Sequence, residues 1–351
     1  MREPRVRTGG TRRWNAARAR EVTLARLTRR SATRRMATVT ASGSPVPAAA
    51  GPCRTITLAD GRTLGFDDIG GRDAPVVLYH HGFGSSRMVR HPDDGIVASL
   101  GLRLIAVDRP GIGLSSGRPG RRLLDWPGDV EQLADRLGIE RFSVLGWSGG
   151  GPYSLALGWS LPDRVDRIGL VSAAAPLVRG ADYLLRHHRV ATRVSDAAPW
   201  MIRLAMWRWS RAQRADPERH LDKAIEGMIE ADKLVLEDPA LRRVMIANAD
   251  ELYRQGGRGL YDEALIMARP WGFPIAGVQV PVRLWHGEAD PAVPVGMGLY
   301  LARTLPRVEA TFFPGEAHHL LYDRWAEILG SFVPPRPAVA PEPEPAASRA
   351  G

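Results

Sequence analysis

The chain has little cysteine, little lysine and no long apolar run. Cys53 is the one cysteine in 351 residues, so an internal disulfide and a zinc site built from several cysteines are both excluded. Of the 48 basic residues only Lys223 and Lys233 are lysines, which leaves 46 arginines. No apolar run approaches the roughly 18 residues that a membrane span needs. We therefore expect a cytoplasmic protein without a membrane span.

The net charge of +10 is confined to the start of the chain. Residues 1–40 hold twelve arginines but only two acidic residues, Glu3 and Glu21. Of 48 basic and 38 acidic residues in all, 36 of each remain for the rest of the chain, whose net charge is zero. We therefore do not expect the body of the chain to bind nucleic acid.

Both ends of the chain have compositions that predict disorder. Residues 1–50 form an arginine-rich extension and linker, and residues 334–351 form a tail of proline, glutamate and alanine. A further hypothesis is that translation starts at Met36, because spurious upstream extensions read from a GC-rich genome are typically rich in arginine. These segments are left out of the predicted fold.

Between the two ends, short apolar runs alternate with helical patterns. The expected strands are 55–58, 63–67, 76–79, 102–107, 142–147, 165–172, 282–285 and 308–313. The expected helices include one that ends at Leu100, 126–137, one that follows the strand 142–147 and ends at about Leu161, 295–304 and 321–332. Such alternation predicts a mostly parallel sheet covered on both faces. It stops over residues 177–270, where apolar residues recur at helical spacing. We therefore predict an α/β core at 51–176 and 271–333, with a helical cap at 177–270 between strands 6 and 7.

One turn concentrates the chemical signals. The strand that ends at Trp147 runs into Gly146-Trp147-Ser148-Gly149-Gly150 and then into a helix. This Gly-x-Ser-x-Gly pattern is typical of a nucleophile elbow, in which a strained serine is exposed at the corner and the flanking glycines permit close backbone contact.

A serine nucleophile needs a base and an acid, and candidates follow two later strands. Asp290 stands in the loop after residues 282–285, with Glu288 as its alternative, and His318 and His319 follow residues 308–313. Parallel strands place their carboxyl ends at one edge of the sheet, where an open α/β sheet holds its site. The order Ser, Asp, His matches only one of the familiar triad orders.

These motifs, together with His81-Gly82-Phe83-Gly84 and Asp108-Arg109-Pro110-Gly111, make residues 55–332 resemble the α/β-hydrolase superfamily in its capped serine branch. The resemblance implies Ser148 as nucleophile, Asp290 as acid and His318 as base, with His319 as the alternative base. It also implies that the backbone amides of Phe83 and Gly149 form the oxyanion hole.

The resulting expectation is an esterase-like serine hydrolase that acts on a small, apolar substrate through an acyl-enzyme, without cofactor or metal. The adjacent His80 and His81 point to opposite faces of a strand and disfavour a metal site. Trp207 and Trp209 are candidates for the pocket wall. The alternatives are perhydrolase or haloperoxidase-like activity, amide or C–C bond hydrolysis, and a ligand-binding protein without catalysis. The oligomeric state is left open.

Overall fold

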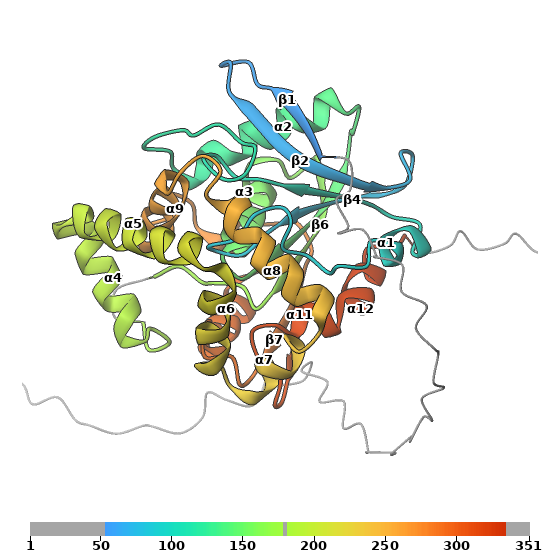
Figure 1. The fold of residues 1–351 in the computed structure, drawn as a ribbon. Coiled ribbons are helices and arrows are strands. Elements are labelled where there is room, and N and C mark those ends of the chain that lie inside the picture. The colour runs from blue at the N-terminus through green and yellow to red at the C-terminus, as the bar shows by residue number, and fades with distance from the viewer. Residues whose placement is uncertain (1–52, 178–180, 335–351) are drawn as a thin grey trace, which may run out of the picture. The chain divides into compact units, whose positions relative to one another are not determined.

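A single twisted sheet organises the chain (Figure 1). The computed structural model describes residues 53–177 and 181–334; the predicted extension 1–50, the alternative start Met36 and nearly all of the predicted tail lie outside them. Within that part the strand order is β1-β2-β4-β3-β5-β6-β7-β8. The strands are β1 Cys53–Thr57, β2 Thr63–Gly70, β3 Val76–His80, β4 Arg103–Val107, β5 Phe142–Trp147, β6 Val165–Val171, β7 Val282–Gly287 and β8 Val308–Phe313. β2 runs antiparallel to both of its neighbours, and all other pairs are parallel.

Helices cover both faces of the sheet because its central strands are apolar on both sides. Leu78, Val144 and Leu284 face a cluster that includes buried residues of α2 (Trp126–Arg136), α3 (Gly151–Ser160) and α10 (Val295–Thr304). Alternate positions such as Tyr79 and Leu145 face a second cluster, to which α1 (Gly95–Ser99), α11 (Leu320–Asp323) and α12 (Trp325–Gly330) contribute. The predicted architecture is thus confirmed.

In the part of the chain that the structure describes, six α-helices stand between β6 and β7, coloured yellow-green to orange in Figure 1. We call them the insertion: α4 Arg186–Ala197, α5 Pro199–Ala215, α6 Pro217–Glu226, α7 Glu230–Val235, α8 Pro239–Leu252 and α9 Arg258–Ala268. A small cluster joins Leu252 and Leu260 of the insertion to Ile112, with Phe83 packed against it. The insertion therefore packs on the loops that follow β3 and β4. Among the described residues no helix is both long and apolar enough to span a bilayer.

Two helix predictions are wrong in extent. The segment expected to be helical up to Leu100 is a helix only over α1, because the chain before it contains Pro92 and is held by the buried side chain of Arg87, which bonds to Asp67 and Asp108. The last helix is broken at Arg324, where the guanidinium turns back to Glu316 and lies 3.6 Å from the centre of the Phe313 ring.

His80 at the end of β3 is a buried, neutral histidine. Its Nε2 accepts a hydrogen bond from the Trp126 indole at 3.1 Å, so Nδ1 carries the proton and donates to Ser154 Oγ at 2.9 Å. Burial, assisted by the charge of Arg109, lowers the pKa of His80 to about 3. The side chain is therefore a structural connection between β3, α2 and α3.

Acid should destabilise the fold through His80. Below an unfolded pKa of about 6.5 the unfolded chain binds a proton that the folded chain rejects, so stability falls as the pH falls from there towards 3. Between pH 7 and pH 5 the free energy of unfolding should fall in the wild type by about 2 kcal/mol more than in His80→Gln. Urea denaturation at both pH values measures this difference. Equal losses in the two proteins would contradict this account.

Candidate active site

Ser148 occupies a strained corner. β5 ends at Trp147, a 3-10 turn covers Ser148–Gly150, and α3 starts at Gly151. The φ angle of Ser148 is 54°, and among the described residues Ser172 is the one other non-glycine with positive φ. Such a conformation costs on the order of 1–3 kcal/mol and persists only where surrounding packing imposes it.

Glycine makes that packing possible. A side chain on Gly150 would clash with the carbonyl oxygen of His80, and one on Gly146 would meet Ser154 Oγ and, at 2.8 Å, the Gly150 carbonyl. The elbow is therefore pressed against the end of β3 and against its own following helix. This close contact is the physical reason for glycine on both sides of Ser148.

An acid and a histidine meet where β7 and β8 end. Asp290 Oδ2 lies 2.8 Å from His318 Nδ1, and Asp290 Oδ1 accepts the backbone N–H groups of Ala292 and Val293, each at 2.8 Å. The Asp290 side chain has no exposed area. The carboxylate is thus fixed by two amides and bonds to Nδ1 at the edge of the imidazole. Glu288, the alternative acid, is exposed.

Trp147 joins this pair to the elbow. Its indole N–H donates to the His318 carbonyl at 3.1 Å, and its ring centre is 5.3 Å from that of His318. The residue immediately before Ser148 therefore contacts the histidine directly. Segments 171 residues apart in sequence lie side by side here.

His319 has a different acidic partner. Its backbone N–H donates to Asp232 Oδ1 at 2.8 Å, and its ring Nδ1 lies 3.0 Å from the same oxygen without the orientation of a hydrogen bond. Burial opposes ionisation of Asp232, but the close His319 ring and the hydrogen bond from the His319 backbone N–H outweigh it, and the pKa of Asp232 is lowered. Asp232 belongs to α7, so His319 connects the histidine loop to the insertion.

The two amides expected at the oxyanion hole lie on touching segments. A Cβ built on Gly149 would be 2.8 Å from the Phe83 nitrogen, and one on Gly82 would be 3.5 Å from the Ser148 Cβ. The loop after β3 therefore runs directly over the elbow, with no room for side chains at Gly82 or Gly149.

A buried arginine fixes the orientation of this loop. Arg109 donates to the carbonyl of His81 at 2.6 Å and to that of Gly82 at 2.9 Å, and it forms an ion pair with Glu263 of α9. In a trans peptide the C=O and N–H groups point in opposite directions. Holding the Gly82 carbonyl therefore directs the Phe83 N–H away from Arg109.

Trp209 of α5 forms an apolar wall beside this loop. Its ring centre is 6.2 Å from that of Phe83, and its indole N–H donates to His220 at 3.0 Å. Trp207, the other candidate for the pocket wall, is 52% exposed. Of the two tryptophans, the structure places only Trp209 against an expected site residue.

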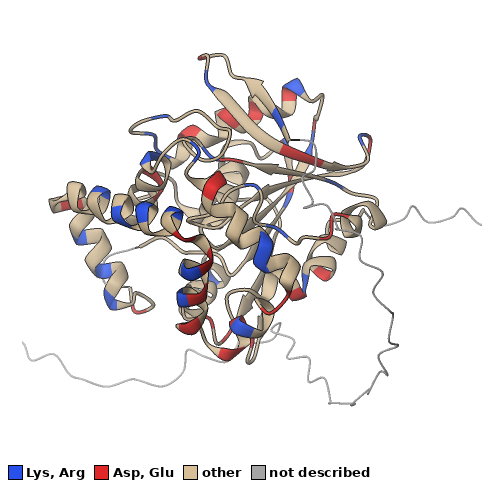
Figure 2. Cartoon of the chain, in the orientation of Figure 1, with Lys and Arg blue, Asp and Glu red and all other residues tan. Residues whose placement is uncertain are grey.

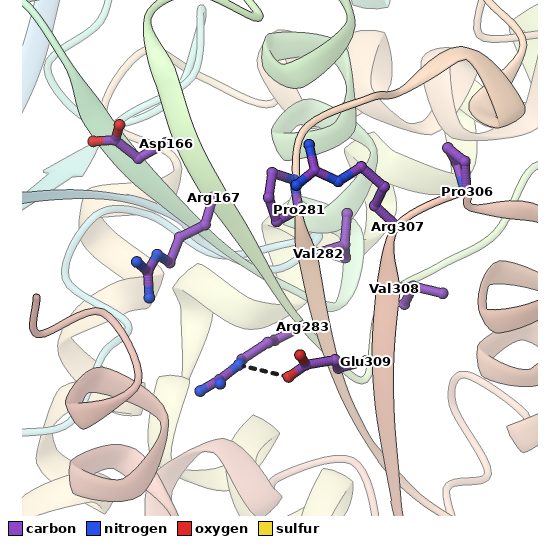
Figure 3. A pocket seen from close by; sticks show the side chains of 9 residues that line it. All are labelled: Asp166, Arg167, Pro281, Val282, Arg283, Pro306, Arg307, Val308 and Glu309. Atoms are coloured by element: carbon purple, nitrogen blue, oxygen red, sulfur yellow. Dashed lines mark hydrogen bonds and ion pairs between the residues drawn. The ribbon is translucent and has the colours of Figure 1, made fainter. Parts of the chain in front are cut away.

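His286 packs behind the acid, with its Nε2 4.0 Å from Asp290 Oδ2, whereas the surface hollow at the far edge of the sheet is separate from this site. His286 is buried and lies 2.9 Å from the Val293 carbonyl, and no group of three metal-ligating side chains occurs within the described ranges. This hollow has a volume of about 460 Å³. Arg283 and Glu309 in its lining form an ion pair at 3.1 Å, and Figure 3 draws the lining side chains. The hollow lies at the amino ends of β6–β8, the edge opposite Ser148.

Sequence reasoning missed the contributions of Arg109, Glu263 and Asp232. Arg109 stands in a quoted motif, but nothing in that motif says which carbonyls it binds. Glu263 and Asp232 are 154 and 87 residues from their partners, in helices without a recognisable motif. No local signal could have identified them.

Comparison with known proteins places the chain in a family. Residues 75–324 match the family model described as alpha/beta hydrolase fold, so the chain belongs to that family, and the fold predicted from its motifs is confirmed. The chain is 28% identical over 285 residues to the dihydrolipoyllysine-residue acetyltransferase component of the acetoin cleaving system of Pseudomonas putida, covering 80% of this chain and 68% of the relative.

A second relative and a solved structure are also similar to this chain. The pimeloyl-(acyl-carrier protein) methyl ester esterase of Nitrosomonas europaea is 28% identical over 232 residues, covering 64% of this chain and 82% of the relative. A hydrolase from Pseudomonas aeruginosa PA01 superimposes with a TM-score of 0.63 at 18% identity over 82% of this chain and 100% of that one. The similarity to this solved structure concerns the fold alone.

The glycine contacts predict that two glycine-to-alanine substitutions change the stability of the fold in opposite directions. Gly150→Ala should lower the free energy of unfolding by about 3 kcal/mol or more, because the new methyl group meets the rigid His80 carbonyl. Gly128→Ala in α2 meets nothing within 4 Å and should raise stability by about 0.5–1 kcal/mol. Urea denaturation measures both, and a tolerated Gly150→Ala would show that the elbow is not closely packed.

Proposed function

We propose that this protein is a serine hydrolase that cleaves an ester-like carbonyl bond of a small, apolar substrate. The observation that carries the proposal is the buried Asp290–His318 hydrogen bond beside the strained Ser148 elbow. Membership of a hydrolase fold family and similarity to an esterase support the reaction class.

Each residue has a distinct role in the proposed reaction. His318 takes the proton of Ser148 as the hydroxyl attacks the carbonyl carbon, and Asp290 holds the ring through Nδ1 and stabilises its positive charge. The ring then gives the proton to the leaving alcohol. Water, activated by the same imidazole, releases the acyl group and restores the Ser148 hydroxyl.

The negative oxygen of the tetrahedral intermediate is bound by the amides of Gly149 and Phe83. Rigid backbone donors stabilise this charge without reorganising, and one donor is typically worth 10²–10³ in rate. Trp209 and Phe83 offer an apolar surface beside these donors, which favours an apolar acyl or alcohol group in the substrate.

The decisive experiment is labelling with a fluorophosphonate probe together with hydrolysis of p-nitrophenyl esters. Ser148→Ala should abolish both while leaving thermal unfolding nearly unchanged, because the alanine fits the same partly exposed corner. Labelling that persists in Ser148→Ala would contradict the proposal, as would a wild-type protein that neither labels nor hydrolyses any ester.

The adjacent histidines supply a matched control. His318→Ala should lower kcat by about 10³-fold or more, since the base is lost. His319→Ala should retain most activity, because Asp232 keeps its bond to the backbone N–H at that position. The reverse result would assign the base to His319.

Arg109→Lys tests the orientation of the Phe83 amide. One ammonium cannot reproduce both carbonyl bonds and the Glu263 pair, so we expect kcat to fall at least about tenfold while KM changes little. Steady-state kinetics with a p-nitrophenyl ester gives both constants.

Arg121→Lys is the control for this prediction. Arg121 lies in the same buried group, donates to Tyr153 Oη at 3.1 Å and is 3.5 Å from Glu263, but it bonds to neither loop carbonyl. Its kcat should stay near that of the wild type. Equal losses in the two variants would indicate general destabilisation instead of oxyanion-hole positioning.

A further inference from the structure

Two helices of the insertion expose an unusual amount of apolar surface. Of nine large apolar side chains that are exposed among the described residues, six belong to α4, α5 and the residue before α4. They are Leu185, Val190, Trp200, Met201, Leu204 and Trp207. We call this set the α4–α5 face. Trp200 and Trp207 are 64% and 52% exposed, whereas large aromatic side chains are normally buried.

The face has the periodicity of one helix surface. Trp200, Leu204 and Trp207 follow at intervals of four and three, so they form one stripe on α5. Beside that stripe, α4 and α5 lie against each other and enclose an open groove of about 600 Å³. Its lining is mostly apolar and includes Val190, Val194 and Ile202.

Positive charge surrounds this apolar surface. Together α4 and α5 contain seven arginines and one carboxylate, Asp196. Figure 2 shows basic residues along both helices. The arginines are Arg186, Arg189, Arg193, Arg203, Arg208, Arg211 and Arg214. All seven arginines are exposed. The Arg211 guanidinium lies 5.2 Å from the centre of the Trp207 ring, so charge and apolar surface are adjacent.

We propose that the α4–α5 face docks on the surface of an anionic lipid bilayer. Exposed tryptophan and aliphatic side chains flanked by arginine are the features of a helix that lies in the interface plane, with its apolar side chains at the headgroup boundary and its cations on lipid phosphates. A second copy of the chain fits less well, because pairing like faces brings two arginine-rich surfaces together.

The position of α5 connects this docking to the proposed reaction. Trp207 points to solvent, whereas Trp209, two residues later, contacts Phe83 at the site. A bilayer-bound α5 therefore lies between the lipid and the expected oxyanion loop. This connection rests on the proposed hydrolase function, but binding to the bilayer does not require catalysis.

The test measures vesicle co-sedimentation of the full chain. We expect the wild type to bind vesicles of phosphatidylcholine with phosphatidylglycerol much more than vesicles of phosphatidylcholine alone, and to lose binding as salt is added. Trp200→Asp with Trp207→Asp should weaken binding at least about tenfold, because two interfacial anchors are lost and two negative charges are gained.

A charge-matched control separates the face from the arginine-rich start of the chain. Leu234→Asp with Val333→Asp adds the same two negative charges at exposed apolar positions outside α4 and α5. This pair should bind within about twofold of the wild type. Thermal unfolding of both pairs verifies that the fold persists.

Three results would overturn the proposal. One is a wild type that binds neither vesicle, and another is equal binding by the two double variants, whether both are weakened or both bind like the wild type. The third is sedimentation velocity showing a wild-type dimer that Trp200→Asp with Trp207→Asp dissociates while vesicle binding is absent, which would assign the face to a second copy. Retained ester hydrolysis with lost vesicle binding leaves the proposed function intact.

Discussion

Close backbone contact at the elbow is the constraint on which the site depends. Ser148 keeps a positive φ because Gly150 lies directly against the His80 carbonyl and Gly146 lies against α3. That contact also sets where the loop after β3 runs, so the Phe83 amide and the Gly149 amide come to lie on touching segments. The strained conformation of Ser148 is thus held by the same packing that brings the two expected oxyanion-hole amides together.

Buried charges connect the insertion to the sheet. Arg109 joins two loop carbonyls to Glu263, and Asp232 joins α7 to the histidine loop. Each contact satisfies a group that would be costly to bury alone. The insertion is therefore bonded to both sides of the site, one contact beside the oxyanion loop and the other beside His318. Movement of α7 or α9 relative to the sheet would have to break one of these bonds.

α5 presents one side to the candidate active site and another side to solvent. Trp209 completes an apolar wall at Phe83 and hydrogen-bonds to His220, whereas Trp200 and Trp207 stand exposed among arginines. Binding of apolar substrate and binding to an apolar, negatively charged surface would then use opposite sides of one helix. The exposed side has no counterpart elsewhere in the described chain, where large apolar side chains are exposed only singly.

The sequence alone predicted the sheet and the strand-to-helix elbow, because strand periodicity and glycine turns are local signals. It also placed Ser148, Asp290 and His318 in loops at the same edge of the sheet, because the carboxyl ends of parallel strands lie at one edge. It left His318 and His319 unresolved and underestimated the breaks at Pro92 and Arg324. Only the tertiary structure gives each histidine its acidic partner, because that partner lies on another element: Asp290 after β7 for His318, and Asp232 in α7 for His319. The assignment of His318 as the base stays a prediction. Pairings between residues far apart leave no trace in a single sequence, and so Arg109, Glu263 and the exposed side of α5 emerged only once the chain was folded.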